Sequence, residues 1–413
     1  MTRGEPLSGI QLRPLGPGDD LEAELDLRRR AFGPVSAPQL PAWLTSMRTS
    51  IEAGATIGAF DGHRLVGSAR YHLMQQWWHG RPMPMAGVGG VKVAPEERGR
   101  GIGTAMMARL LRDVADRGYP VSALYPATAP LYRSFGWEIA GGKYQTVVPV
   151  RSLAALIGPD ESVAAVAGHG PAHAAPVLRR ATPDEGAAVV AVKGLVHDRL
   201  RHCGPNTREP WELRDWLADP EHFAYLADDG FLSYRWARQA DEIDVEELIA
   251  ASAATARALW QVLASHATMV TKIRACLAPD DPVHVLSREP DAELHRTEAW
   301  MLRVVDAAAA VAARGYPASV SVSVPIDLAD PVLPVNAGRW RLEVADGKGS
   351  LQRADGGTAA AALRLGARGF AALFAGSAVG TLRLAGLADG GDPAADDALE
   401  AAFRGHAFMI DEW

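Results

Sequence analysis

The sequence predicts a mixed α/β protein of the α+β class, built from three consecutive segments. Its 413 residues are too many for one compact domain, because hydrophobic cores stop growing at roughly 250–300 residues. Strand and helix patterns alternate through the first segment and recur in a similar order in the second, which indicates an internal duplication. The third segment is richer in strand patterns. We therefore expect two related α/β units followed by a third, strand-rich unit.

The first segment reads as strands and helices separated by clear turn signals. Gly33-Pro34 and Gly118 end two of the helices, and Asp61-Gly62 forms a turn between two strands. Helices are expected at residues 20–32, 103–117 and 129–135, and strands at 56–60, 65–72, 87–93, 120–125 and 144–150.

Residues 157–176 are rich in Ala, Gly and Pro and read as a linker to the second segment. In the second segment, helices are expected at 184–203, 209–217 and 253–266, and strands at 223–226, 230–237, 243–250 and 269–275. In the third, strands are expected at 301–304, 320–326, 339–344, 349–353 and 360–365, and helices at 305–313, 367–374 and 393–403. The apolar residues Phe408, Met409, Ile410 and Trp413 predict a docked terminus instead of a frayed one.

Composition excludes several classes of function. The net charge of −7 argues against a general nucleic-acid binder and suits a cationic small molecule. The cysteines, Cys203 and Cys276, suggest neither a disulfide framework nor a cysteine-based metal site. No signal-peptide pattern or membrane-length apolar run is present, so we expect a cytoplasmic protein without a membrane partner.

A glycine loop between a strand and a helix carries the chemistry. Its residues are Val91, Lys92, Val93, Arg98, Gly99, Arg100, Gly101, Ile102, Gly103 and Thr104. A helix N-terminus carries partial positive charge and free N–H groups, and glycines let a pyrophosphate approach the backbone closely. A Walker A loop would need Lys before Thr104, and a dinucleotide loop would need a different glycine spacing. An ordinary strand–turn–helix is the alternative interpretation.

The arrangement R-x-x-G-x-G after V-x-V resembles motif A of the GCN5-related N-acetyltransferases. Residues 119–124 and 131–137 are similar to the enhanced intracellular survival (Eis) group of these enzymes, and looser matches extend to Arg314-Gly315-Tyr316 and the acidic–aromatic terminus. The resemblance implies tandem GNAT folds followed by a sterol-carrier-like α/β domain, assembled as a homo-hexamer. It implies acetyl-CoA as co-substrate, bound by the glycine loop, and no metal.

By this resemblance, the expected domains span residues 1–155, 156–298 and 299–413. The first holds the cofactor loop. At the equivalent place in the second, residues 252–257 contain no glycine, so a pyrophosphate could not approach that backbone as closely. We expect no acetyl-CoA site there.

The resemblance also implies the catalytic residues. Tyr132 matches the general acid that protonates the leaving thiolate, and the carboxylate of Trp413 matches the general base. A packed core tyrosine and a frayed tail are the alternatives for these two residues. Tyr125, Asp411, Glu412 and Trp77 are expected to line the acceptor pocket, although core packing or a subunit contact would explain Trp77 equally well. Tyr125 stands where some relatives have His.

The predicted activity is therefore acetyl transfer to primary amines of cationic small molecules such as aminoglycosides, which would give antibiotic resistance. A protein lysine acetyltransferase is an alternative with the same chemistry. A lipid- or sterol-binding protein acting through the third segment, and a non-catalytic acetyl-CoA scaffold, are alternatives of other classes. No nucleic-acid partner is expected.

Overall fold

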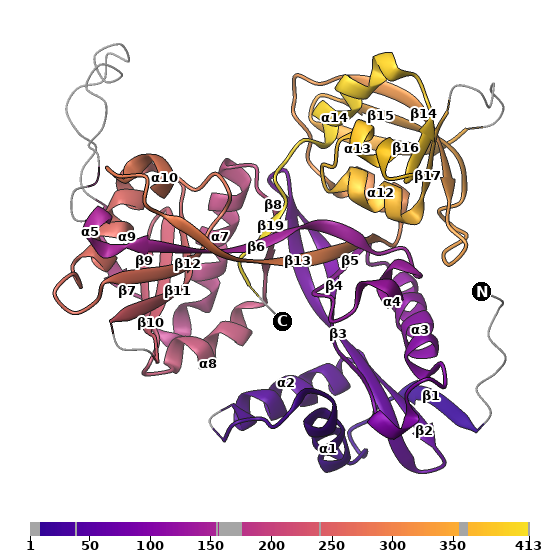
Figure 1. Cartoon of the computed structure of the whole chain (residues 1–413), viewed down its shortest axis with the longest axis horizontal. Coiled ribbons are helices and arrows are strands. Elements are labelled where there is room, and N and C mark those ends of the chain that lie inside the picture. The colour runs from indigo at the N-terminus through magenta and orange to yellow at the C-terminus, as the bar shows by residue number, and fades with distance from the viewer. Residues whose placement is uncertain are drawn as a thin grey trace.

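The computed structural model of the chain describes residues 9–37, 39–153, 156, 176–238, 241–354 and 362–411. Figure 1 shows three units, with the first in indigo and purple, the second in magenta and orange, and the C-terminal unit mostly in yellow. The mixed α/β class expected from the sequence is confirmed. None of the helices in these ranges has the length and apolar composition that crossing a bilayer requires.

The first unit begins with a strand and two helices before its central strands. Its elements are β1 (Ile10–Pro14), α1 (Leu21–Phe32), α2 (Leu40–Glu52), β2 (Thr56–Asp61), β3 (Arg64–Trp78), β4 (Arg81–Val93), η1 (Pro95–Glu97), α3 (Ile102–Asp116), β5 (Val121–Leu124), α4 (Ala129–Arg133), β6 (Glu138–Pro149) and α5 (Val150–Leu153). Helix α3 buries Met107, Leu110, Leu111 and Val114, the face predicted from their spacing, against the strands. The sequence did not predict β1 or α2.

The second unit repeats this order of strands and helices. Its elements are β7 (Arg179–Arg180), η2 (Pro183–Glu185), α7 (Gly186–Arg199), β8 (Cys203–Thr207), η3 (Pro210–Glu212), α8 (Leu213–Ala218), β9 (Phe223–Ala227), β10 (Gly230–Trp236), β11 (Glu242–Ala250), α9 (Ala253–Ala264), β12 (Lys272–Cys276), α10 (Val283–Leu286) and β13 (Glu293–Val304). The expected linker lies outside the described residues, except for Pro176.

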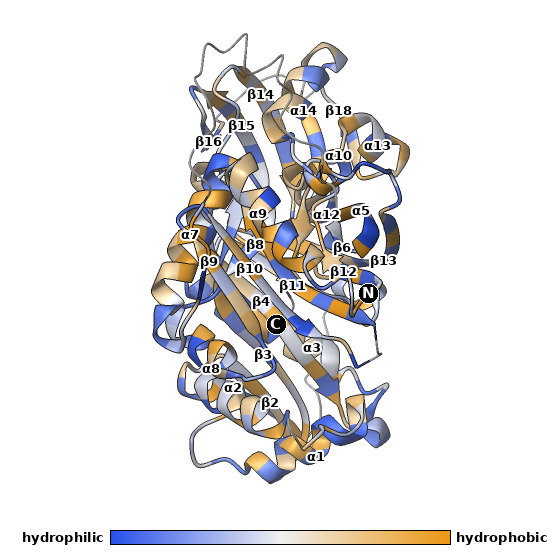
Figure 2. Cartoon of the chain, turned by 90° about the vertical axis from the view of Figure 1, so that its left-hand side faces the viewer, coloured by the Kyte–Doolittle hydropathy of each residue, from blue (hydrophilic) through white to orange (hydrophobic). Residues whose placement is uncertain are grey.

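Two predicted helices of the second unit differ from the structure. The helix expected at 184–203 ends at Arg199, because Cys203 begins β8, which pairs with β3 of the first unit. The helix expected at 209–217 is divided into η3 and α8, with Pro210 opening the first turn. Figure 2 shows orange residues on α7, which packs beside β8.

The first two units share one sheet. Within the described residues its main path is β1-β2-β3-β4-β5-β13-β6-β12-β11-β10-β9-β7. Strand β13 belongs by sequence to the second unit, yet it lies antiparallel between β5 and β6. The strand expected at 301–304 is therefore the end of a longer one, and the expected domain boundary at 298/299 falls inside β13. In Figure 1, β6 and β13 run between the two units.

The C-terminal unit is a separate sheet with helices packed on it. Its elements are α11 (Ala307–Ala313), β14 (Val322–Ala329), β15 (Gly338–Ala345), β16 (Lys348–Arg353), β17 (Leu363–Gly366), α12 (Ala367–Phe374), α13 (Val379–Leu384), β18 (Ala388–Gly390), η5 (Pro393–Ala395) and α14 (Asp396–Phe403). The sheet order is β16-β15-β14-β17-β18. Buried Arg314 donates to the carbonyls of Phe374 and Phe403 at 2.5 and 2.9 Å, which ties α12 to the end of α14.

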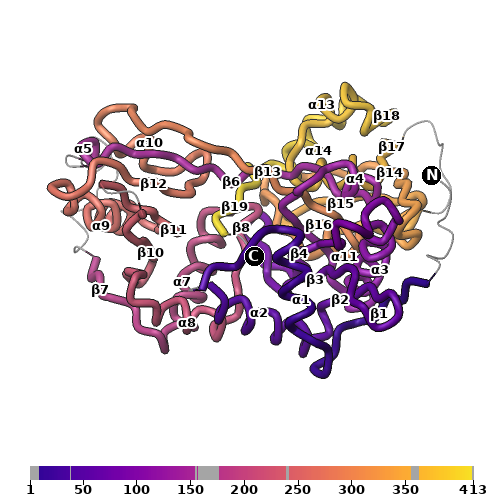
Figure 3. The backbone as a smooth tube through the Cα atoms, turned by 60° about the horizontal axis from the view of Figure 1, so that its bottom comes forward, coloured from indigo at the N-terminus to yellow at the C-terminus, as the bar shows by residue number. Residues whose placement is uncertain are grey.

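The chain then leaves this unit and returns to the large sheet. Strand β19 (Phe408–Met409) pairs in parallel with Gly142 and Lys143 of β6. Phe408, Met409 and Ile410 are buried, as expected of a docked terminus. Figures 1 and 3 both place β19 between the first and second units.

Candidate active site

The pairing of β4 with β5 ends beside the glycine loop. Their parallel register runs from Met85–Val121 to Val88–Leu124, and β4 then continues to Val93 with only β3 as a ladder partner among the described strands. Opposite Ala69, β4 has a bulge at Gly90 and Val91, where Gly90 has φ +60°. Residues 89–93 therefore have no strand partner on the β5 side among the described strands; this unpaired stretch, called the opening below, is where an extended ligand could bond to the backbone.

The loop after β4 leads into an uncapped helix. Gly99 and Gly101 have φ of +82° and +79°, and Gly101 is the N-cap of α3 with no side-chain hydrogen bond to the first turn. A Cβ at Gly103 would lie 3.8 Å from Val93 Cγ2, which is ordinary contact. Protein atoms therefore do not crowd the space above Gly103. These features fit an anion approaching the N–H groups at the start of α3, where Thr104 is exposed.

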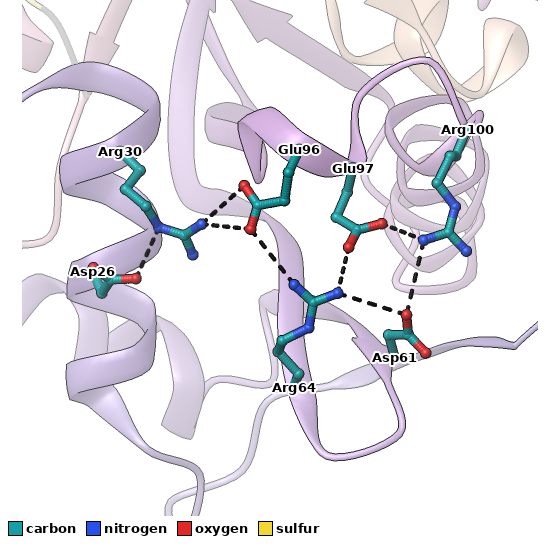
Figure 4. A network of polar contacts seen from close by, with 7 residues as sticks. All are labelled: Asp26, Arg30, Asp61, Arg64, Glu96, Glu97 and Arg100. Atoms are coloured by element: carbon teal, nitrogen blue, oxygen red, sulfur yellow. Dashed lines mark hydrogen bonds and ion pairs between the residues drawn. The ribbon is translucent and has the colours of Figure 1, made fainter.

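A network of ionic contacts holds the turn before this loop (Figure 4). It consists of Asp26, Arg30, Asp61, Arg64, Glu96, Glu97 and Arg100. The Glu97 carboxylate bonds to Arg100 and to Arg64, and both guanidinium groups lower its pKa. Arg100 therefore faces these carboxylates in this structure, whereas Arg98 is exposed at the rim of the loop.

Lys92 is turned away from the loop. Its Nζ lies 2.6 Å from Glu24 Oε1 of α1, and both side chains are almost fully buried. Burial lowers the pKa of Lys92, opposed by Glu24. In this structure the Lys92 side chain serves the α1–β4 contact, so its expected part in cofactor binding is limited to its backbone.

Tyr132 lies on α4, which follows β5 at the opening. Its side chain is 6% exposed, and its ring contacts Trp137 edge-on with centroids 6.4 Å apart. Burial raises the pKa of its hydroxyl, which is therefore protonated at neutral pH. A protonated phenol at this place can donate a proton or a hydrogen bond.

The C-terminal strand meets the end of β5. The Tyr125 hydroxyl donates to the Asp411 carbonyl at 2.9 Å, so these two expected pocket residues are in contact. The Asp411 carboxylate lies 3.4 Å from Lys193 Nζ of α7, toward the second unit. Glu412 and Trp413 lie outside the described residues.

Trp77 does not join this group. It is 9% exposed, and its ring lies 5.5 Å from that of His197 on α7, so it packs between the two units. Core packing, the alternative considered for Trp77, describes its place in the structure. Sequence reasoning missed Lys193, although a lone lysine within the apolar run 189–196 was a signal of an unusual environment.

The second unit has the same strand geometry with a different helix start. The parallel register of β11 and β12 ends at Val245–Ala275, and β11 continues to Ala250. The N-cap of α9 is Ser252, whose hydroxyl accepts from the Thr255 N–H at 3.3 Å. This helix N-terminus is therefore partly satisfied by its own side chain.

Comparisons with known proteins agree with this division. Residues 12–140 and 204–304 each match an acetyltransferase (GNAT) domain model, and residues 307–410 match a sterol carrier protein domain model. The chain is 31% identical over 335 residues to N-acetyltransferase Eis of Mycobacterium tuberculosis, covering 77% of each chain. A GCN5-related N-acetyltransferase structure from Kribbella flavida is 38% identical with a TM-score of 0.89, covering 98% of both chains. Eis1 from Mycobacterium abscessus is 25% identical with a TM-score of 0.75, covering 98% of this chain and all of that one.

Proposed function

Because the chain belongs to the Eis family of GNAT N-acetyltransferases, we propose that it acetylates primary amines of cationic small molecules such as aminoglycosides. One observation carries the proposal most directly. In the first unit the opening between β4 and β5 meets an uncapped helix N-terminus, a buried tyrosine and the C-terminal strand.

The glycine loop is proposed to hold acetyl-CoA, the co-substrate of GNAT enzymes. The N–H groups of residues 98–104 would bind its phosphates with Arg98 beside them, and the backbone of 91–93 would bond to its extended arm. When bound, acetyl-CoA supplies the acetyl group as a thioester. The room left at Gly103 fits this assignment.

Tyr132 is proposed as the general acid. Its raised pKa keeps the proton on the hydroxyl, so the group can donate it to a departing thiolate. An N–H of 91–93 is proposed to stabilise negative charge on the carbonyl oxygen under attack.

The carboxylate of Trp413 is proposed as the general base that takes the proton from the acceptor amine. The Tyr125–Asp411 hydrogen bond supports this proposal, since it brings the chain two residues before Trp413 to the end of β5. A carboxylate is a weak base in water, with a pKa of about 3.5, so it would act by stabilising the ammonium or through a water molecule.

The acceptor contacts are proposed from charge. The net charge of −7 favours cationic molecules, but the Asp411 carboxylate is paired with Lys193. Glu412 and Tyr125 are therefore the proposed acceptor contacts. By family resemblance we also propose a homo-hexamer, which light scattering would show as six times the 43.9 kDa chain mass; a monomer mass would refute it.

A thiol-release assay with acetyl-CoA tests the function. The acceptor panel should contain aminoglycosides, polyamines and lysine peptides, and the proposal expects the fastest turnover on small polycations. Preference for the peptides would support the protein acetyltransferase, and no turnover on any amine with lipid retained through purification would support lipid binding. A second arm adds one glycine after Trp413. A folded, extended enzyme with full kcat would refute the proposed base.

A further inference from the structure

The second unit forms a socket around the C-terminal strand. Phe408 and Ile410 share one buried cluster with residues of α7, β10 and β11, namely Val189, Val192, Val196, Phe231 and Ile249. The fit is close on the β8 side as well. A Cβ at Gly204 would lie 2.3 Å from the Phe408 carbonyl oxygen, and Gly204 has φ +104°. Only a glycine at this position lets the strand lie so near β8.

A buried ionic cluster sits at the end of this socket. Lys193 Nζ lies 2.8 Å from Glu247 Oε2 and 3.4 Å from Asp411 Oδ2. The Lys193 and Glu247 side chains are each 6% exposed. Burial acts to lower the pKa of Lys193, but the two carboxylates raise it, so the ammonium is charged. An ammonium with so little access to water needs both partners, which favours an Asp411 side chain that points toward α7, although that side chain is itself 26% exposed.

The same residue, Asp411, reaches the candidate active site through its backbone. Its carbonyl accepts from Tyr125, and Tyr125 directly follows β5 at the opening between the strands. Asp411 therefore links Lys193 to the end of β5, by its side chain on one side and by its carbonyl on the other.

Glu247 has a counterpart in the first unit. Counted from the last parallel pair, Val245–Ala275 or Val88–Leu124, Glu247 and Gly90 occupy the same place on their strands. In the first unit this extension borders the opening beside the glycine loop. In the second unit it carries a carboxylate that binds the tail through Lys193.

We propose that the second unit is a socket that positions the C-terminal strand, with Lys193 as the positioning residue that sets Asp411 at the end of β5. The proposal rests on the proposed function for the identity of the base at Trp413, and on the structure alone for the placement of Asp411. Lys193 does not touch the reacting groups. It acts through Asp411 on the geometry of the first unit's site.

The test is a double-mutant cycle on kcat. Lys193→Met is combined with Glu247→Gln, so that no buried carboxylate is left without its cation. This variant and Asp411→Ala should each lower kcat by about 100-fold, the effect of a misplacement of about 1 Å, with an unchanged KM for acetyl-CoA. Because both act through one contact, combining all three substitutions should lower kcat no further than Asp411→Ala alone.

Arg274→Met is the matched control. Arg274 pairs with Glu242 and Asp244 within the second unit, away from the tail. It should cost stability and leave kcat unchanged. If the Lys193 variant keeps full kcat, raises the KM for acetyl-CoA instead, or loses kcat additively with Asp411→Ala, the positioning role is refuted. Asp411→Ala leaves Lys193 paired with Glu247, so one arm remains folded if the other does not.

The enzyme with one glycine added after Trp413 separates the two proposals. If the extension abolishes turnover while the Lys193 variant keeps it, the base assignment stands and the socket fails. If the extension is harmless but the cycle between Lys193 and Asp411 is non-additive, the socket stands and the base assignment fails.

Discussion

The two GNAT units have the same strand geometry and different helix starts. Both β4 and β11 continue past the last pair with the neighbouring parallel strand. At the helix that follows, the first unit has Gly101 in the left-handed region with no side-chain cap, and the second has Ser252 bonded to the Thr255 N–H. The fold thus gives both units the same strand geometry, whereas the helix starts differ in whether a side chain already bonds to their first N–H groups, which is the difference an anion would meet.

The two units also differ in the side chains that lie beside the extended strand. The first unit places the buried Tyr132 beside it. In the second unit, Phe408 and Ile410 of the C-terminal strand line a cavity beside the extension of β11, and Glu247 on that extension pairs with Lys193. The first unit thus carries the residues of the predicted chemistry, and the second unit packs against the C-terminal strand.

The largest expected effect is on kcat, and it distinguishes the two GNAT units by their buried tyrosines. Tyr132→Phe should lower kcat by about 100-fold or more, because the departing thiolate loses its proton donor, while the KM for acetyl-CoA changes little. Tyr234→Phe is the control in the second unit, where the hydroxyl lies 3.1 Å from His266 Nε2. Steady-state kinetics of both variants is the measurement. Equal kcat for Tyr132→Phe and the wild type would remove Tyr132 from the mechanism.

The next effect concerns the start of the helix. Gly101→Val places a β-branched residue at φ +79°, which costs about 1–2 kcal/mol or displaces the loop. We expect the dissociation constant of acetyl-CoA, measured by calorimetry, to rise by roughly 10-fold or more. Ser252→Val is the matched substitution in the second unit and should leave that constant unchanged. A loss of affinity in both variants would mean that the second junction also contributes to binding.

The third effect is a pH dependence of stability that comes from Glu247 in the second unit. Burial raises the pKa of Glu247 to about 7, with Lys193 opposing the shift and Asp411 and Glu246 adding to it; buried His197 interacts with Lys193. The folded state therefore binds a proton more tightly than the unfolded state, whose glutamate has a pKa near the ordinary 4.5. The stability from this proton is complete below the unfolded value and is lost as the pH rises toward 7.

Chemical denaturation between pH 5 and 8 checks this linkage. Relative to Glu247→Gln, the wild type should lose at most about 1.4 kcal/mol per pH unit as the pH rises to 7, since one proton is involved. Parallel stability curves for the two proteins would show that Glu247 does not titrate in this range.

The smallest effect removes the cap that distinguishes the second unit. Ser252→Ala should lower the free energy of unfolding by about 1 kcal/mol, because the Thr255 N–H loses its acceptor. Urea denaturation measures the loss, and acetyl-CoA binding should be unaffected. Gain of a second acetyl-CoA site in this variant would show that the cap alone keeps the second unit inactive.

The sequence predicted the features that depend on neighbouring residues. The helix face of α3 and the glycine loop follow from spacing and from the conformational freedom of Gly99 and Gly101. The two GNAT units and the sterol carrier unit, inferred by resemblance, are confirmed. The orientation of Lys92 was missed because a motif lists residues without saying which face of a strand they occupy, and alternation along β4 turns it inward.

Features that join distant residues could not be predicted in this way. The Lys193–Asp411 contact spans 218 positions, and no local pattern encodes it. The place of β13 between β5 and β6 is likewise a matter of strand order, which hydrophobic periodicity does not determine. The roles of Tyr132 and Trp413 stay predictions until the kinetics are measured.

The insertion of β13 sets an order of events during synthesis of the chain. The edge of β5 is covered only when residues 301–304 arrive from the ribosome. At about 5–20 residues per second, the wait after residue 124 is roughly 10–40 s. During that time the nascent first unit presents the unpaired backbone of β5, a template for mispairing with another chain. A fragment that ends near residue 155 and leaves the ribosome without β13 should therefore aggregate. A chain that continues through β13 can pair this strand with β5.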